Sequence, residues 1–402
     1  MMKIQRRTLF VCLSSLFLVY STISRFSIYY LGISVISAMI LLLYILGFIV
    51  QPKIANNNKE AFLFLWGWGI VFLISTILNG ARPGLIHLNS FLFCYLVLCL
   101  SKDIQREVFN KFVWLLSVLV LLSAIEYIMY SITGKGVVLA SVTRSTDYRE
   151  TNFTHLLFNV LRLDLIIHRF QGLFKEPGNM GTTCAFMLFA TWKIKSMKIP
   201  FIIFLICGLL SLSLAFYIFL FIFLLSNVKP NIKNLIMLTL ITIPLLYVFK
   251  DNFEYKIIER IDNADSPEEL DNRTSKSFNR SFAKAFENGK LWLGVGIDNI
   301  PESVSADGGN AGGKPWLYQY GILSFIIVFY IFNVIYYRRC NKSLTIHDWV
   351  FLFVYWACFY KSVVFTTPSI FIVYIMMPMI NKISEYECSN GDDSLSSQLD
   401  VL

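Results

Sequence analysis

Arg169, Gly172 and Glu176 place a cation, a flexible glycine and a carboxylate within one short polar stretch that ends at Asn179. An arginine in this setting can donate two parallel hydrogen bonds to a phosphate. A nearby carboxylate can accept a proton from a hydroxyl nucleophile. The same residues also suit a helix entrance, where Glu176 would favour the positive end of the helix dipole. Both a catalytic site and a plain helix start remain open.

A second cationic stretch runs from Asp271 to Gly289. Asp271 or Asn272 is expected to cap a helix that ends at Asn288 and Gly289. Phenylalanines recur every four residues on one face, and basic residues lie on nearly the opposite face. These residues are Phe278, Phe282 and Phe286, and then Arg273, Lys276, Arg280 and Lys284. The basic face would suit a pyrophosphate if it lines a cavity, and anionic lipid or water if the helix lies on a membrane.

Two glycine-rich turns follow this helix. Gly294 and Gly296 do not form a dinucleotide fingerprint, because no strand precedes them and a third glycine is missing. They indicate a turn. Asp298 comes next, and a glycine cluster around Asn310 predicts a mobile loop that ends at Lys314.

Metal and cofactor chemistry are not expected. None of the four histidines lies near another histidine or a cysteine at metal-ligand spacing. The sequence has no phosphate-binding loop for ATP. Its eight cysteines show no paired spacing that would suggest disulfides.

The composition predicts an integral membrane protein. Of 402 residues, 56% are hydrophobic and only 15% are charged. The apolar residues fall in continuous runs long enough to cross a hydrocarbon core of about 30 Å, which favours helices over a barrel. The formal net charge of +9 sits largely in short loops between these runs. We read it as the positive-inside signature of cytoplasmic loops and expect no nucleic-acid partner.

The predicted fold is all-α, with about twelve transmembrane helices and two long, partly helical external loops. The expected segments are helices 1–5 in 1–132, a periplasmic loop in 133–180, helices 6–9 in 181–249, a large periplasmic loop in 250–315, helices 10–12 in 316–380 and a cytoplasmic tail in 381–402. Two runs, 199–228 and 349–380, are too long for one crossing, so each should form a hairpin. The turns are expected near Ser211–Ser213 and Thr366–Pro368.

Three local features add to this picture. A charged start, 1–7, precedes an apolar run without a small-residue cleavage site, which favours a retained first helix over a signal peptide. The stretch Asn152–His168 reads as an amphipathic helix on the membrane surface. Glu126 lies near the outer end of a span, where a carboxylate either faces a cavity or reaches the interface.

In four places the sequence resembles the Wzy-type O-antigen and exopolysaccharide polymerases, which belong with the O-antigen ligases. The first is the Arg-x-x-Gly-x-Phe-x-Glu-Pro pattern from Arg169 to Pro177. The others are a Ser-rich hairpin, a late external loop with an early arginine and a Leu-Gly-x-Gly segment, and a span that opens with an aromatic residue before Gly-Ile. They correspond here to 210–214, to Arg273 or Arg280 with 293–296, and to Trp316 with Gly321 and Ile322.

The resemblance implies an inverting glycosyl transfer on the periplasmic face of a bacterial inner membrane. The loop charges predict that both chain termini lie in the cytoplasm. Donor and acceptor would be glycans on undecaprenyl pyrophosphate, and membrane lipids and a chain-length regulator would be further partners. Arg169 and Arg280 would stabilise the pyrophosphate leaving group, assisted by Arg273 and Lys284. Glu176 would be the first candidate for the general base and Asp298 the second. The remaining candidate substrate-binding residues are Gly172, Asn310 and Lys314.

Two other functions remain as alternatives. Ligases of this family usually carry His-Asn in the late loop, whereas this chain has Asn310 and no histidine there. A flippase or transporter for lipid-linked oligosaccharides would also fit about twelve spans. Such a protein is expected to have similar halves or charged, broken helices at the midplane, and the polar residues here gather in two unequal loops instead.

Overall fold

The computed structural model describes residues 2–23, 33–51, 58–78, 85–146, 149–162, 169–174, 176–227, 274–296, 312–361, 365 and 367–390. These residues are mostly helical. The helices are α1 (Met2–Thr22), α2 (Ile33–Val50), α3 (Lys59–Leu73), α4 (Leu85–Cys99), α5 (Lys102–Thr133), α6 (Pro177–Thr191), α7 (Lys198–Leu210), α8 (Leu214–Asn227), α11 (Lys276–Glu287), α13 (Gly313–Arg339), α14 (Ile346–Ala357) and α15 (Pro368–Asn390). Short helical turns are η2 (Ile74–Leu78), η3 (Lys195–Met197), η6 (Lys290–Trp292) and η8 (Cys358–Tyr360).

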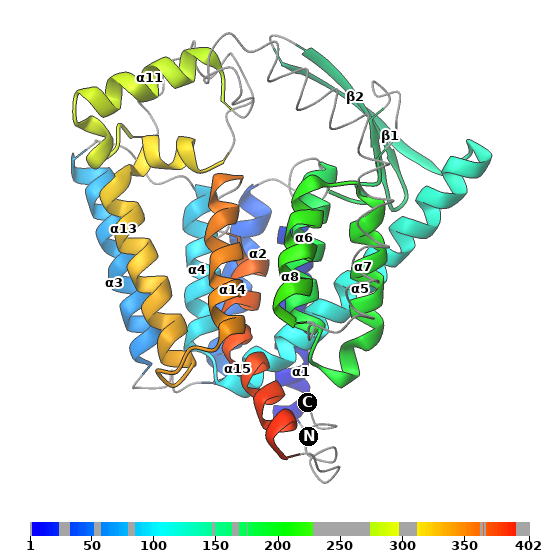
Figure 1. Ribbon diagram of the computed structural model, residues 1–402, viewed down its shortest axis with the longest axis horizontal. Coiled ribbons are helices and arrows are strands. Elements are labelled where there is room, and N and C mark those ends of the chain that lie inside the picture. The colour runs from blue at the N-terminus through cyan, green and yellow to red at the C-terminus, as the bar shows by residue number, and fades with distance from the viewer. Residues whose placement is uncertain are drawn as a thin grey trace.

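Most of the helices stand side by side as a bundle (Figure 1). Helix α1 begins and α15 ends at one end, which we call the lower end, and α11 and a small sheet lie at the upper end. Within the described ranges, three helical stretches are long and apolar enough to cross a membrane: Lys59–Ile77, Lys102–Thr133 and Gly313–Arg339. Several apolar helices are shorter, among them α8 and α14.

Both hairpins expected from the long apolar runs are present as helix breaks. The first run divides into α7 and α8 around Ser211–Ser213, where Leu212 has a φ of 47°. The second divides into α14, η8 and α15, and α15 starts at Pro368. Proline suits this first position, because its missing N–H would have no partner inside the helix.

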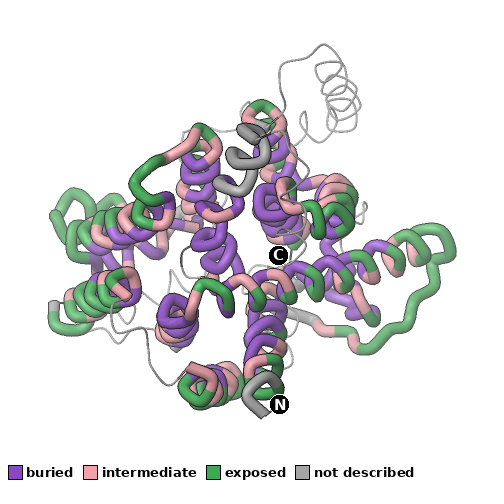
Figure 2. The backbone as a smooth tube through the Cα atoms, turned by 90° about the horizontal axis from the view of Figure 1, so that it is seen from below, coloured by how far each residue is buried: buried purple, intermediate pink, exposed green. Residues whose placement is uncertain are grey.

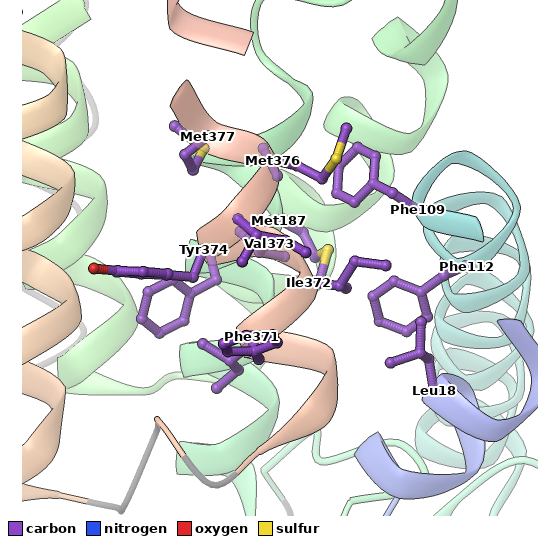
Figure 3. Close-up of a cluster of buried hydrophobic side chains, with 14 of the residues drawn as sticks. Leu18, Phe109, Phe112, Met187, Phe371, Ile372, Val373, Tyr374, Met376 and Met377 are labelled. Atoms are coloured by element: carbon purple, nitrogen blue, oxygen red, sulfur yellow. The ribbon is translucent and has the colours of Figure 1, made fainter. Parts of the chain in front are cut away.

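Helix α15 forms the centre of the core. Almost every side chain from Ser369 to Met377 is buried, in keeping with an apolar sequence on all of its faces. Figure 3 shows Phe371, Ile372 and Val373 of α15 among side chains from other helices, such as Phe112 of α5 and Met187 of α6. The part of α15 from Ser369 to Met377 is therefore enclosed by the earlier helices.

The first long loop contains a sheet, and the expected amphipathic helix at Asn152–His168 is wrong for its described part. Strands β1 (Val138–Thr146), β2 (Arg149–Leu156) and β3 (Val160–Arg162) form an antiparallel sheet in the order β1-β2-β3. Residues 163–168 lie outside the described residues. Successive side chains from Phe153 to Leu156 are all buried, so β2 lacks the alternation that identifies a half-exposed strand.

The start of α11 also differs from expectation. Its N-cap is Ser275, whose hydroxyl accepts a hydrogen bond from the backbone N–H of Phe278 at 3.1 Å, so neither Asp271 nor Asn272 caps the helix. The expected end is confirmed: Asn288 is the C-cap and Gly289 follows with a φ of 70°.

Ion pairs join helix ends at the lower end of the bundle. Arg7 of α1 pairs with Glu107 of α5 at 2.6 Å, and Arg339 of α13 pairs with Glu60 of α3 at 2.7 Å. Glu60 lies in the first turn of its helix and Arg339 in the last turn of its own, so each charge also suits its helix dipole. Segments expected on the same side of a membrane thus meet at one end of the bundle.

Candidate functional site

Arg169 lies against the turn that joins α7 to α8. Its Nη2 atom donates to the carbonyl oxygen of Leu212 and, at 3.4 Å, to that of Ser211. Its Nε atom is buried and has no acceptor among the described residues. Burial lowers the pKa of the Arg169 guanidinium, but arginine stays protonated in proteins. Arg169 is therefore a cation held in place by the turn, and the described residues leave its Nε–H donor unused.

The segment that carries Arg169 rests on α5. Gly172 has a φ of 54°, and a Cβ atom at this position would lie 3.3 Å from the Cβ atom of Ser123. The Gly172 carbonyl accepts a hydrogen bond from the N–H of Val160 in β3 at 2.8 Å. This hydrogen bond joins the sheet to the Arg169 segment. A side chain at position 172 would strain the backbone and crowd Ser123 of α5.

Glu126 of α5 holds the turn between β2 and β3. Its carboxylate accepts hydrogen bonds from the backbone N–H groups of Leu157 and Phe158 at 3.0 and 2.8 Å, and from Nδ2 of Asn159 at 3.0 Å. Asn159 Nδ2 also donates to the Ser123 carbonyl at 2.7 Å. A carboxylate near the end of a long apolar helix thus anchors the sheet that leads to Arg169.

We expect Glu126→Ala to loosen this turn. The two backbone bonds to Glu126 are only partly buried, and a typical intramolecular hydrogen bond contributes about 0.5–1.5 kcal/mol. Local opening should then become easier, and amide exchange at Leu157 and Phe158 should accelerate about 2- to 13-fold in hydrogen-exchange mass spectrometry. Ser131→Ala on an exposed part of the same helix is the control and should leave these amides unchanged. Equal exchange in wild type and Glu126→Ala would remove Glu126 from this role.

The start of α6 is a second cationic point. Glu176 is exposed at the N-cap position, and its side chain makes no capping hydrogen bond. Lys361, which follows η8, donates through Nζ to the Gly178 carbonyl at 2.5 Å and to Thr182 Oγ1 at 2.6 Å. An ammonium group at the positive end of a helix adds to a potential that attracts anions.

The start of α6 and the α7–α8 turn are in contact through small residues. A Cβ atom at Gly181 of α6 would lie 2.5 Å from the Cβ atom of Ser213 and 3.0 Å from Ser211 Oγ. Only glycine lets the first turns of α6 approach the α7–α8 turn so closely. The lysine-bearing helix start and the arginine-bearing turn are therefore parts of one surface.

The Leu293–Gly296 segment docks onto a break in α13. Gly321 interrupts this helix with a φ of 89°. Near the break, the carbonyls of Tyr318 and Gln319 accept hydrogen bonds from the N–H groups of Val295 and Gly296 at 2.7 and 3.1 Å. Gly294 has a φ of 84°, and a Cβ atom there would collide with the backbone of α13. The turn expected from the two glycines is thus a docking element.

Helix α11 is fixed to α13 through its apolar face. Phe278 is buried with its ring centroid 5.4 Å from that of Tyr318, and Phe282 packs on the same cluster. Phe286 is exposed, and so are the two basic residues Arg280 and Lys284. Lys314 of α13 donates to Asn279 Oδ1 at 3.4 Å. The phenylalanine face therefore packs partly on protein, and Arg280 and Lys284 of the basic face are exposed.

The segment 358–361 connects the start of α6 with the start of α13. Lys361 contacts α6, while a Cβ atom at Gly312 would collide with the carbonyl oxygen of Tyr360, and one at Gly313 would lie 2.5 Å from the ring of Phe359. Arg169, Lys361 and Lys314 are thus linked by a continuous series of contacts. Arg169 and Arg280 lie on different elements, Arg169 against the α7–α8 turn and Arg280 on the exposed side of α11. Arg273, Asp298 and Asn310 lie outside the described residues.

Sequence reasoning missed Lys361 and left Glu126 undecided. The available signal for Lys361 was a single lysine inside an apolar run of more than thirty residues, close to the expected turn at Thr366–Pro368. For Glu126 it was a carboxylate near the end of a span, but its partners are backbone N–H groups, which no sequence pattern marks.

No family model matches the chain, and no curated protein is significantly similar to it. Fold and site together define a helical-bundle protein. In the part of the chain that the structure describes, three helices could cross a membrane by length and composition, and lysine and arginine side chains lie at the upper end of the bundle.

Proposed function

We propose that this chain is a multi-pass membrane enzyme of Wzy type, which polymerises oligosaccharide repeat units carried on undecaprenyl pyrophosphate. It would have about twelve spans and lie in a bacterial inner membrane, with the upper end of the bundle on the periplasmic face. The observation that carries the proposal is Arg169, a half-buried guanidinium fixed by the α7–α8 turn with a donor that the described protein leaves unused.

The surface of the bundle supports the membrane part of the proposal. Large apolar side chains are exposed on its outward-facing helices, including Leu41, Phe48, Phe62, Trp66 and Ile202. Exposed large apolar side chains on several helices suit contact with lipid. The helix ends that carry Arg7 and Arg339 meet at the lower end, which fits the cytoplasmic side under the positive-inside rule.

The charges at the upper end suit a lipid diphosphate. Arg169, Lys361 and the positive end of α6 meet on one surface, and Lys314 continues it toward α11. The exposed side chains of Arg280 and Lys284 would complete the site from above. Preorganised cations act most strongly on charge that develops in the transition state, as it does on a departing diphosphate.

The reaction is a displacement at the anomeric carbon of the donor glycan. A sugar hydroxyl of the acceptor forms the new C–O bond while the bond to the diphosphate oxygen breaks, and its electron pair leaves with the diphosphate. The hydroxyl proton passes to a general base. Glu176 is the first candidate because its exposed carboxylate makes no capping bond and follows the Arg169 segment directly. Asp298 remains the second.

Deleting the gene and examining the surface polysaccharide tests the proposal. We expect the lipid-linked product to be limited to single repeat units, because the repeats are made and exported but not joined. Loss of all repeats from the outer face would indicate a flippase, and long polymer that is not transferred to its acceptor would indicate a ligase. Either of these results would contradict the polymerase.

A further inference from the structure

The outer end of α5 and the base of β1 form one exposed apolar surface, which we call the lip. Its residues are Ile128, Met129, Ile132, Val137, Val138, Leu139 and Leu157. Ile132 is 78% exposed and Val138 is 56% exposed. The two parts are continuous, because a Cβ atom at Gly136 would contact both Tyr130 of α5 and Leu156 of β2. In Figure 1 the end of α5 stands clear of the rest of the bundle.

The lip continues a partly exposed apolar stripe of α5. Trp114, Leu115, Val118, Leu121 and Ile125 are all exposed on this helix. Figure 2 shows exposed residues recurring along the same helix and continuing into the chain that leaves it. A helix that is long and apolar enough to cross a membrane presents such a stripe to the acyl chains.

Helix length places the lip at the edge of the membrane. The charged residues of α5 end with Lys111 on the lower side, apart from Glu126. The apolar part from Phe112 to Ile132 rises about 31 Å at about 1.5 Å per residue, close to a hydrocarbon core of about 30 Å. Because α5 is inclined to its neighbours in Figure 1, its vertical rise is shorter. The residues directly after the helix then remain at the level of the lipid.

Strand β1 changes from apolar to polar residues along its length, as expected for a strand that leaves the lipid for water. It starts with Val138 and Leu139 and continues through Ser141 to Thr143, Arg144, Ser145 and Thr146. An apolar base and a polar tip indicate a water boundary that crosses the strand after Leu139.

We propose that the lip is a lipid-binding surface seated at the acyl-chain and headgroup boundary of the outer leaflet, so that the sheet rises from the membrane surface. The occupant is the bilayer itself. The inference rests on the membrane part of the proposed function and not on the polymerase activity. It places the Arg169 segment, which the sheet supports through Val160, close to the level of lipid headgroups.

Cysteine substitution in proteoliposomes tests the lip. Val138→Cys is compared with Ser141→Cys, because both side chains are exposed in the protein and the lip includes position 138 but not position 141. The purified full chain is reconstituted in phosphatidylethanolamine and phosphatidylglycerol and treated with a membrane-impermeant maleimide. We expect Val138→Cys to react at least about tenfold more slowly, because a thiol in apolar surroundings forms little thiolate. The unsubstituted chain gives the background from native cysteines.

A second measurement gives a positive signal for the same variants. A small environment-sensitive fluorophore attached at position 138 should emit at shorter wavelength than one at position 141, and brominated lipids should quench it more strongly. Equal labelling and equal quenching at the two positions would overturn the inference. Protection of position 138 in cells but not in proteoliposomes would also overturn it, since a protein partner would then be the cover. Retention of the chain in carbonate-washed membranes separately checks the membrane part.

Discussion

Arg169→Lys is expected to reduce the rate of polymer formation by about 100- to 1,000-fold, the usual cost of removing one preorganised donor from a site of developing charge. A lysine is a point charge and cannot both hold the carbonyl of Leu212 and present a second donor in the same plane. The measurement is the turnover of purified protein on lipid-linked repeat units. Arg169→Ala should be at least as severe.

The folded state must be controlled, because Arg169 also stabilises the α7–α8 turn. Thermal stability in detergent separates a collapsed turn from a lost catalytic contact. Arg338→Lys, an exposed arginine of α13 next to Arg339, is the matched substitution and should leave turnover unchanged. Arg280→Ala tests the other half of the site. Full turnover in folded Arg169→Ala and Arg280→Ala proteins would exclude both residues from the mechanism.

The sequence predicted the helical architecture well where long apolar runs carried the signal. The α7–α8 turn was predicted because a single crossing would have put two lysine-rich loops on opposite faces. The break before α15 was predicted as a turn near Thr366–Pro368, because the apolar run around it is too long for one crossing. Both arguments use length, charge and backbone chemistry within one segment of chain.

The sheet could not be predicted in the same way. Strand β2 is stabilised by β1, with pairs such as Val142 and Phe153, and by the carboxylate of Glu126, which holds the turn that follows. These partners come from other segments, and burial on both faces removes the alternation that marks a strand. A hydrophobic stretch with a few charges then resembles an amphipathic helix.

The candidate site also combines residues that a local pattern predicts with one that only the fold brings near. Arg169, Gly172 and Glu176 were predicted from one local pattern, and they lie on the short segment that leads into α6. Lys361 joins this segment through Gly178 and Thr182, although it is nearly two hundred residues away in sequence. A contact of that range depends on the packing of α6 against the last helices, which periodicity does not reveal.

At the lower end of the bundle, Arg339→Ala is expected to destabilise the protein by about 3–5 kcal/mol, because removing one partner leaves a largely buried charge uncompensated. Arg339 and Glu60 are 7% and 18% exposed in their side chains. The arginine also donates to Gln105 Oε1 of α5 and to the Ile375 carbonyl of α15, both at 3.0 Å. One guanidinium therefore joins four helices.

Equilibrium unfolding in mixed micelles measures this effect, with Arg338→Ala as the control, which should change stability by less than about 0.5 kcal/mol as an exposed substitution. The double variant Arg339→Met with Glu60→Met separates two explanations. If the cost comes from a stranded carboxylate, replacing both charges by apolar side chains should recover much of the lost stability. If the double variant is as unstable as Arg339→Ala, the cost lies in the lost bonds to Gln105 and Ile375, and the ion pair itself contributes little.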